Sequence, residues 1–475
     1  MYYRLKDQYA LRGWQEKHFC LLDLSDPYAI PLRMSASDFF VLSDCDGSHD
    51  LEETALIRSF LDRGIIEPGT APLRDEQDYI AYPFVQRSSA RISITNRCNC
   101  RCPHCYAADE NGALADEISF PAFGDIIGQL KETGIRRVRL TGGEPLLHPD
   151  LENILRLLYN EQMRLELLYT NGILLNKHIL GLLGRFEPKP IVRVSFDGFG
   201  VHDWMRGRNG AEHETLNALS LLKENGFPIE IAMSINGRTI NSALDSCRQL
   251  VRSYDCDLYI FYTSPSPRWL AAATEKDLLS LGEYFDFCRD LCAASIAENW
   301  GCFIKPFLHP GNRFKESAQT DEAPLNEAAK KAGRHTLLDC PQACAMIHIA
   351  NDGRVLPCSG FEGASRAEDF LTDDDSNIYK RRLKDILTDS SYLEPFRATM
   401  DDLLTMEDSC RSCRWLYLCK GGCRLLSLDQ FRDDIRYDRK SDYQCLFYRG
   451  GYYEKYTHAM KEATLEKQRR SDENA

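Results

Sequence analysis

The middle of the chain alternates between two patterns of apolar residues. Short apolar runs typical of strands recur at residues 91–95, 138–140, 165–168, 191–194, 229–235 and 257–262. Longer segments with helical apolar spacing follow them, at residues 124–134, 151–162, 178–186, 215–226, 243–254 and 275–299. Apolar strands that alternate with helices predict a parallel α/β sheet. The six strand–helix units are fewer than the eight of a closed barrel, so we expect an open, partial (β/α)6 barrel.

The residues before this pattern predict a separate small α+β unit. Residues 17–24 and 28–34 alternate like the two strands of a hairpin around Ser25, Asp26 and Pro27. A short helix should follow, capped by Ser35 or Ser37 and ended by Gly47. A second helix is expected from Asp50 to Arg63, and residues 70–89 are expected to be a linker.

The residues after the alternating pattern are turn-rich and dense in cysteine from Cys340 onward, with a hairpin predicted around Asp352 and Gly353. Residues 316–333 should form a flexible or helical bridge, and Asp373 to Asp375 a solvated loop. The charged tail from Glu462 is expected to fray. The predicted division is therefore 1–75, a linker at 76–90, a barrel at 91–305, a bridge at 306–339, a cysteine-rich domain at 340–450 and a tail at 451–475.

Composition narrows the class of protein. Of the 475 residues, 43% are hydrophobic and the net charge is −13, which argues against nucleic acid as the main partner because phosphate binding draws on Lys and Arg. The sequence has no apolar stretch of membrane-spanning length and no signal-peptide pattern at its start. We therefore expect a cytoplasmic protein.

Cysteine is unusually frequent, at 19 residues. Without a secretion signal, metal or cluster ligation is a better explanation than a disulfide framework. Eight cysteines fit no ligand spacing and are predicted to be small buried apolar residues: Cys20, Cys45, Cys100, Cys247, Cys256, Cys288, Cys292 and Cys302.

Three further cysteines follow the first barrel strand at C-x3-C-x2-C spacing, namely Cys98, Cys102 and Cys105. A [4Fe–4S] cluster is normally held by four thiolates, so three leave one iron open to another ligand. That ligand is expected to be S-adenosylmethionine, bound through its amino and carboxylate groups. An electron from the cluster could then split the sulfonium and release a 5′-deoxyadenosyl radical. Zinc or redox chemistry is the alternative for such a short loop taken alone.

Polar, glycine-rich segments end the next three strands. They are Thr141-Gly142-Gly143-Glu144-Pro145, Tyr169-Thr170-Asn171-Gly172 and Ser195-Phe196-Asp197-Gly198. Taken singly, the first could be an ordinary turn and the second a hairpin corner. Together they stand at the strand ends where a β/α barrel assembles its active site.

This set of motifs resembles the radical S-adenosylmethionine (radical SAM) superfamily over roughly residues 91–300. The resemblance implies an open barrel with a gap for a large substrate. It also implies roles in binding S-adenosylmethionine for Tyr106, Gly142, Gly143, Glu144, Asn171, Ser195 and Arg206. Asp197 is expected only to hold loops.

The cysteines of the C-terminal region resemble the twin-cluster SPASM extension of radical enzymes that modify peptides and proteins. By that resemblance, one auxiliary [4Fe–4S] cluster is held by Cys340, Cys344, Cys358 and Cys423, and a second by Cys410, Cys413, Cys419 and Cys445. If only one of Cys340 and Cys344 is a ligand, the first cluster keeps an open iron. Structural zinc is the alternative for the whole set, and the loop at Cys98 favours iron–sulfur.

The N-terminal unit resembles the small winged-helix domain with which ribosomal-peptide maturases bind a precursor's leader peptide as an added strand. A small domain that merely caps the barrel is the alternative. The expected function is therefore a maturase that abstracts hydrogen from a precursor peptide and installs a thioether or carbon–carbon crosslink. The segment SFDGFGVHDWMRGRNG resembles thioether-forming maturases.

Other functions remain open at this stage. An anaerobic sulfatase-maturing enzyme, which makes formylglycine in a protein substrate, suits the segment CRWLYLCKGGCR but not the N-terminal unit. A non-enzymatic metal-binding scaffold would need the radical motifs to be broken, and they are intact. The extra clusters would accept the electron that crosslinking releases, and an external donor such as flavodoxin or ferredoxin is an expected partner.

Overall fold

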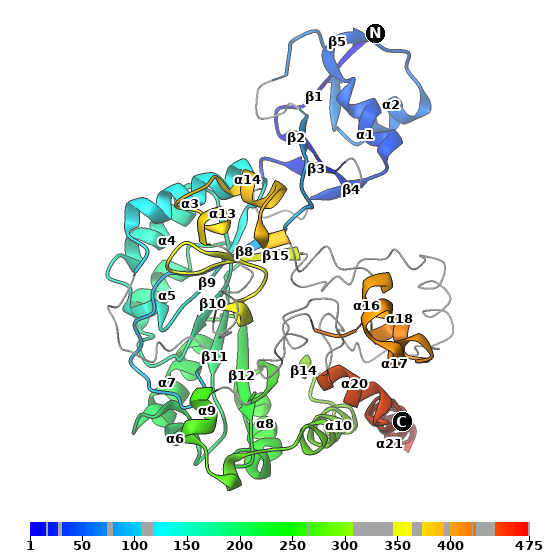
Figure 1. The fold of residues 1–475 in the computed structure, drawn as a ribbon. Coiled ribbons are helices and arrows are strands. Elements are labelled where there is room, and N and C mark those ends of the chain that lie inside the picture. The colour runs from blue at the N-terminus through cyan, green and yellow to red at the C-terminus, as the bar shows by residue number, and fades with distance from the viewer. Residues whose placement is uncertain are drawn as a thin grey trace.

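The computed structural model describes residues 1–15, 18–26, 31–73, 79–105, 117–264, 267–306, 345–362, 373–393, 400–419, 421–423 and 442–473. Figure 1 shows a small N-terminal unit at one end of a large α/β body, with the last helices beside the far strands of that body. The strands form one nine-stranded sheet and two smaller sheets of three and four strands. Among the described residues, no helix is long and apolar enough to cross a membrane.

The N-terminal unit has its own apolar core, which includes Tyr3, Leu11, Phe39 and Phe60. Its elements are β1 (Tyr2–Leu5), β2 (Tyr9–Trp14), β3 (His18–Asp23), β4 (Leu32–Met34), α1 (Ala36–Ser43), β5 (Asp46–Asp50), α2 (Ala55–Asp62) and β6 (Ile66–Pro68). The expected hairpin is confirmed, since β3 and β4 pair antiparallel. The cap at Ser35 is also confirmed, because its hydroxyl accepts the Asp38 N–H and supplies one of the helix's missing acceptors.

Three expectations for this part of the chain were wrong. The first helix ends at Ser43 rather than at Gly47, which lies in β5. The second helix does not begin at Asp50, which ends β5; it begins at Ala55, where the Thr54 side chain caps it. The segment expected to be a linker contains β7 (Ile80–Tyr82), which adds a parallel strand to β2. Trp14 stacks on Tyr82 with ring centroids 5.3 Å apart, and both belong to the apolar core of the large body. The segment therefore ties the two units together.

The large sheet carries the predicted partial barrel. Its first six parallel strands are β8 (Ser89–Ser93), β9 (Arg137–Thr141), β10 (Arg164–Thr170), β11 (Ile191–Ser195), β12 (Ile229–Ile235) and β13 (Asp257–Tyr262). They lie side by side in chain order. The order and parallel pairing of these strands confirm the open α/β barrel expected from the sequence.

The sheet extends beyond these six strands at both ends. A short β14 (Ile304–Pro306) adds in parallel to β13. At the other end, β15 (Met346–Ile349) adds in parallel to β8 and turns back into β16 (Val355–Leu356). The predicted hairpin around Gly353 is this β15–β16 turn, and it joins the cysteine-rich region to the barrel directly.

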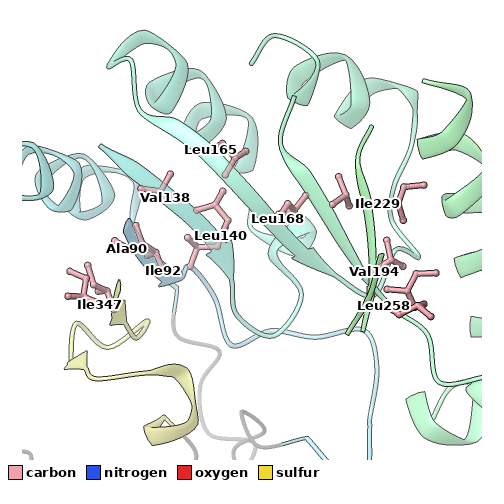
Figure 2. Packing of buried hydrophobic residues seen from close by; sticks show 14 of the residues in the cluster. Ala90, Ile92, Val138, Leu140, Leu165, Leu168, Val194, Ile229, Leu258 and Ile347 are labelled. Atoms are coloured by element: carbon pink, nitrogen blue, oxygen red, sulfur yellow. The ribbon is translucent and has the colours of Figure 1, made fainter. Parts of the chain in front are cut away.

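Helices cover one face of the sheet. The loops between elements also contain the short helices α6 (His202–Arg206) and α9 (Pro267–Ala272) and the 3-10 turns η1 (Pro145–Leu147) and η2 (Glu275–Asp277). The covering helices are α3 (Phe120–Glu132), α4 (Leu151–Asn160), α5 (Lys177–Leu183), α7 (Ala211–Glu224), α8 (Ile240–Tyr254) and α10 (Leu281–Ala297). Figure 2 shows the aliphatic side chains that fill this layer, among them Ala90 and Ile92 of β8 and Val138 and Leu140 of β9. Because side chains alternate along a strand, the residues between them face the other side.

The C-terminal region is a set of short helices followed by a long one. They are η3 (Ser359–Phe361), α13 (Asp373–Ser376), α14 (Leu383–Thr388), η5 (Ser391–Leu393), α16 (Met400–Met406), α17 (Asp408–Arg411), α18 (Leu416–Cys419), α20 (Asp442–Arg449) and α21 (Tyr452–Glu473). The expected bridge at 316–333 lies outside the described residues.

Two more expectations were wrong here. The acidic run at Asp373 is the helix α13, and Asp375 accepts hydrogen bonds from the N–H and hydroxyl of Ser391. The C-terminal tail is the helix α21, which lies along α10 and buries Tyr453 and Tyr456. The high charge of this segment suggested fraying, although its tyrosines form an aromatic stripe that packs against the barrel.

Candidate active site

The loop with the three spaced cysteines leaves the carboxyl end of β8, beside the ends of β9, β10 and β11. Cys98 is exposed, Cys102 and Cys105 are half-buried, and Cys100 is buried, as expected for a packing residue. Tyr106 lies outside the described residues, so its predicted role stays a prediction. Three strand-end segments hold this loop in place, and each is one of the motifs found in the sequence.

The first segment is the glycine pair after β9. The N–H of Gly143 donates to the Thr95 carbonyl at 2.7 Å, and the N–H of Glu144 donates to the Arg97 carbonyl at 2.7 Å. A Cβ atom on Gly143 would lie 2.3 Å from the Arg97 oxygen, and one on Gly142 would lie 2.2 Å from the Thr95 oxygen. Gly142 also has a φ of 144°, which disfavours any side chain. Only glycine allows this close approach of the two backbones.

Glu144 ties the same segment to the end of β10. Its fully buried carboxylate accepts the Thr170 hydroxyl at 2.8 Å and the Leu146 N–H at 3.1 Å on one oxygen, and the Asn171 N–H at 2.7 Å on the other. Burial raises the pKa of Glu144 to about 7, against the effect of these hydrogen bonds. Both oxygens are engaged within the protein, so this side chain acts on the site by positioning the backbone around it.

The second segment is Asn171, whose side chain reaches the cysteine loop itself. Its amide nitrogen donates to the Asn99 side-chain oxygen at 2.6 Å and contacts the Cys100 sulfur at 3.5 Å. Its amide oxygen accepts the Ile173 N–H at 3.0 Å. The buried Asn171 therefore fixes the middle of the loop, between the predicted ligands Cys98 and Cys102.

The third segment, after β11, contains Asp197, which pairs with Arg206 at the end of α6. The Arg206 guanidinium lies 2.6 Å from the carboxylate of Asp197 and 3.8 Å from the sulfur of Cys102, and the Arg206 carbonyl accepts the Arg101 N–H at 2.9 Å. Burial opposes the charge of Asp197, but Arg206 and His202 outweigh it and hold the pKa of that carboxyl well below its usual range. The pair holds loops together, which is the role expected for Asp197.

The loop thiols sit in unequal environments. A hydrogen bond between the side chains of Cys98 and Cys100 holds the pKa of Cys98 below its ordinary value, and nearby Arg206 adds to the effect. Burial raises the pKa of Cys102 to about 11, although Arg206 opposes it, and the Cys105 and Cys98 thiols add to the rise. Metal ligands must be thiolates, so occupancy of this loop would release a proton from Cys102.

The described residues hold no group of three or more His, Cys, Asp or Glu side chains arranged around a single metal ion. In an iron–sulfur cluster each thiolate binds a different iron, so the three loop thiols need not meet at one point. Ser195 ends β11, half-buried, two residues beyond Arg193 and on the same strand face.

A row of cations and aromatic rings that the motifs did not predict lies on the inner face of the barrel. The Arg91 guanidinium lies 4.7 Å from the Tyr169 ring, and that of Arg193 lies 5.1 Å from the same ring. Arg193 also lies 3.5 Å from the Tyr259 ring, which Lys305 approaches at 4.4 Å. These alternating contacts cross the barrel beneath the cysteine loop and form its floor.

The charges of this floor are largely balanced within the barrel. Glu230 accepts two hydrogen bonds from Arg193, at 2.8 and 2.5 Å, and Glu166 accepts one from Arg139 at 3.0 Å. Arg91 donates to the Tyr169 hydroxyl at 2.6 Å. The sequence does carry a signal for this row of side chains, because several strands have an arginine between two aliphatic residues.

Four cysteines of the C-terminal region lie near one another in the structure. Cys445 from α20 and Cys410 and Cys413 from the α17 turn lie close enough to Cys419 to raise its pKa. Together with burial, the largest cause, they bring the pKa of Cys419 to about 12. These are the four residues assigned to the second auxiliary site.

The other predicted set is only half described. Cys358 begins the η3 turn after β16, and the N–H of Cys423 donates to the Gln444 side chain at 3.2 Å. Cys340 and Cys344 lie outside the described residues, so their assignment stays a prediction. Seven of the eight cysteines expected to be packing residues are buried, and the eighth, Cys302, is half-buried.

A comparison with family models matches residues 92–250 to the radical SAM superfamily. Strands β9 to β12 and the clamped cysteine loop lie in this span, so this part of the chain is a radical SAM domain. The antilisterial bacteriocin subtilosin biosynthesis protein AlbA of Bacillus subtilis is 34% identical over 148 residues, which is 31% of this chain and 33% of AlbA. The chain thus spans a third of that curated relative, and about half to just under three-fifths of the next ones.

Two solved structures share the fold over most of the chain. Streptococcus suis SuiB bound to its precursor peptide SuiA covers 93% of this chain and 99% of SuiB, with a TM-score of 0.63 and 14% identity. The enzyme anSMEcpe with bound AdoMet and a peptide covers 80% of this chain and 99% of its own, with a TM-score of 0.57 and 17% identity. At these identities the likeness concerns the fold alone.

Proposed function

We propose that this protein is a radical SAM peptide maturase that crosslinks a ribosomally made precursor peptide. A cluster with an open iron and bound S-adenosylmethionine would supply a primary carbon radical that abstracts hydrogen from the peptide. The bond formed would be a thioether or a carbon–carbon bond. The SuiB likeness carries the proposal, because it extends over 93% of the chain and that structure holds a precursor peptide. AlbA, a bacteriocin biosynthesis protein, adds support from the barrel sequence.

The N-terminal unit fits the role of leader-peptide binding. The β4 strand is an edge of the four-stranded sheet, and its backbone can accept an added strand. Leu32 on this strand is 46% exposed, and Phe40 on the adjoining α1 is 47% exposed. An exposed strand edge can pair with an added strand, and the exposed Leu32 and Phe40 offer apolar contacts to it. The leader peptide is the partner we assign to it.

The three clusters follow from the same proposal. Cys98, Cys102 and Cys105 would hold the catalytic [4Fe–4S] cluster, since the glycine pair, Asn171 and Arg206 keep their loop in a fixed shape. Two auxiliary clusters would be held by Cys340, Cys344, Cys358 and Cys423, and by Cys410, Cys413, Cys419 and Cys445. The proximity of the last four thiols supports one common site for them.

The chain's own residues shape the nucleotide site in two ways. Gly142, Gly143 and Ser195 would offer backbone and hydroxyl groups to S-adenosylmethionine, with Tyr106 near its adenine. Glu144, Asn171 and Arg206 were also assigned to the nucleotide. Their side chains are engaged with the loop or with neighbouring backbone, so we assign them chiefly to positioning.

An external electron donor, a flavodoxin or ferredoxin in the cytoplasm, would complete the system. A surface pocket of about 380 Å³ opens beside Cys413 and is lined by Arg414, Trp415 and Arg449, among others. Exposed arginines next to a cluster ligand suit an acidic redox partner.

A sulfatase-maturing enzyme is the second candidate, and it is not favoured. The anSMEcpe likeness leaves a fifth of this chain uncovered, compared with 7% for SuiB. A protein of that class also has no evident use for the exposed strand edge at Leu32.

Co-expression with a candidate precursor, sought as a small open reading frame beside the gene, tests the proposal. The peptide should lose two hydrogens in mass, and a Cys102→Ala variant should leave it unchanged. The variants Leu32→Asp and Phe40→Asp should weaken peptide binding, measured by fluorescence anisotropy. Tyr159→Asp is the matched control, because this tyrosine is 45% exposed but lies on a barrel helix. An unmodified peptide despite 5′-deoxyadenosine production would refute the maturase assignment.

A further inference from the structure

Three side chains meet where the cysteine-rich region joins the barrel. The ring nitrogen Nε2 of His348, on β15, lies 2.9 Å from Oε2 of Glu362, which follows the η3 turn. The Ser93 hydroxyl, on β8, donates to the same oxygen at 3.2 Å. His348 is completely buried and Ser93 is 1% exposed, whereas the Glu362 side chain keeps 11% of its surface exposed. None of these residues has a role in the function proposed above.

This cluster lies on the inner face of the barrel, near the cysteine loop. Ile92 points into the helix-covered face (Figure 2), so its neighbours Arg91 and Ser93 point inward. Ser93 is in register with Thr141, which directly precedes the glycine pair, and it stands two residues before Thr95, which anchors that pair. The η3 turn closes over this face, because Arg91 donates a hydrogen bond to Ser359.

The hydrogen bonds give the Glu362 carboxylate a fixed orientation. Both donors, His348 and Ser93, act on Oε2. Among the described residues Oε1 has no hydrogen-bond partner. The side chain keeps 11% of its surface exposed, so this second oxygen is the one left to meet a substrate group.

The charges around Glu362 favour its ionised form. Burial opposes ionisation, but the His348 ring, the Ser93 hydroxyl and the more distant Arg354 outweigh it, and the pKa of Glu362 lies below its ordinary value. Arg91, two residues from Ser93, is a further cation on the same strand face. Glu362 is therefore a carboxylate at neutral pH, able to accept a proton.

We propose that Glu362 is the catalytic residue that accepts the proton released when the crosslink closes. The inference rests on the proposed function. The substrate carbon radical bonds to a sulfur or an aromatic carbon, and the S–H or C–H bond at that atom breaks. The proton passes to Oε1 of Glu362, and the remaining electron leaves to an iron–sulfur acceptor. A carboxylate is a weaker base than a thiolate, so the proton moves as the new bond forms and the departing hydrogen becomes more acidic.

His348 and Ser93 are positioning residues in this account. They hold Oε2, keep the carboxylate ionised and leave Oε1 to accept a proton. A junction that served only to attach the cysteine-rich region would have no need of a partly exposed carboxylate.

The first test is Glu362→Gln in the reconstituted enzyme, incubated with S-adenosylmethionine and the candidate precursor peptide. Proton transfer by a positioned side chain is worth about 10²-fold or more, so crosslinked peptide should fall by about 10²-fold. Production of 5′-deoxyadenosine and peptide binding by anisotropy should stay near the wild-type values. Glu161→Gln, a partly exposed carboxylate paired with Lys131 on the outer helices, is the control and should behave as wild type.

The second test is Ser93→Ala, which keeps the carboxylate and removes one donor. The lost hydrogen bond raises the pKa of Glu362, so the acidic limb of crosslink formation should move to higher pH. The rate on the alkaline plateau should be kept. A purely structural role of Ser93 would instead lower the rate equally at every pH.

The outcomes separate the two claims. If the wild type leaves the peptide mass unchanged, the maturase assignment fails. If the wild type crosslinks the peptide and Glu362→Gln, with full iron content, crosslinks it equally well, the assignment to Glu362 fails. Equal loss of crosslink and 5′-deoxyadenosine in Glu362→Gln, together with an unshifted pH profile for Ser93→Ala, would also overturn it.

Discussion

Substitution of Gly143 by alanine should disrupt the cysteine loop from a distance. The new Cβ atom would lie 2.3 Å from the Arg97 carbonyl oxygen and 2.6 Å from that of Asn96. Both contacts are with backbone, so no side chain can rotate away and the two chain segments must move apart. Overpacking typically costs about 1–3 kcal/mol, and rigid backbone contacts place this site near ~3 kcal/mol.

The expected signature is local. The Gly143 and Glu144 N–H groups donate to Thr95 and Arg97 at 2.7 Å, and separation of the segments breaks both bonds. A loss of ~3 kcal/mol of local stability corresponds to about 100-fold faster amide exchange at these positions. Hydrogen–deuterium exchange of the protein, read by mass spectrometry, measures it directly. Iron content after anaerobic reconstitution should fall in parallel.

Gly128 provides the matched control, because a Cβ atom there meets nothing within 4 Å. Gly128 lies inside α3, so Gly128→Ala should stabilise the helix by up to ~1 kcal/mol and leave the loop unchanged. Unchanged exchange and iron content in Gly143→Ala would refute the idea that backbone contact between the glycine pair and the loop shapes the site.

Three more predictions follow from the buried groups. The pKa of Glu144 rises from 4.5 to about 7 on folding, so the folded state holds an extra proton between these pH values. The free energy of unfolding should therefore fall by about 3 kcal/mol as the pH rises through this range. Urea unfolding at about pH 5 and about pH 8 measures this fall, which Glu144→Gln should abolish. Arg206→Met leaves the buried Asp197 carboxylate without its arginine partner, at a cost of ~3 kcal/mol. The double variant with Asp197→Asn should recover part of the lost melting temperature, and no recovery would contradict the ion-pair account. Truncation after Gly451 removes the buried Tyr453 and Tyr456 and exposes α10, so the shortened protein should bind a hydrophobic dye and aggregate; a monomeric, dye-negative product would contradict the packing role of α21.

The barrel was predictable because its strands and helices carry strong periodic signals. Runs such as RVRLT and IVRVS are short, β-branched and bounded by glycine-rich turns, and each became a strand within about two residues of the expected ends. Motif order along the chain also placed the strand-end segments at one edge of the sheet, since parallel strands all end on the same side.

The tail and the linker were mispredicted because tertiary contacts overrode composition. The tail's charges suggested fraying, but three tyrosines at its start supply a stripe that packs on α10. The linker gained the strand β7 only because β2 offers it an edge. Neither partner can be inferred from the local sequence.

The sequence predicted which residues belong to the site, but not the role of each residue there. The motifs predict that Glu144 and Asn171 belong to the site. In the structure their side chains bond to neighbouring backbone and to the cysteine loop, and do not point into open space. Glu362 could not be found from the sequence, because its importance arises from a long-range meeting with Ser93 on β8. Such contacts depend on the pairing of β15 with β8, which no local pattern encodes.

The most direct test of the account is the iron and sulfide content of anaerobically purified protein, with and without Cys98, Cys102 and Cys105. The triple alanine variant should lose about four irons and four sulfides relative to the wild type, and with them all reductive cleavage of S-adenosylmethionine. Equal iron in the two proteins, or zinc in the wild-type loop, would contradict the claim that this loop holds an open-iron cluster.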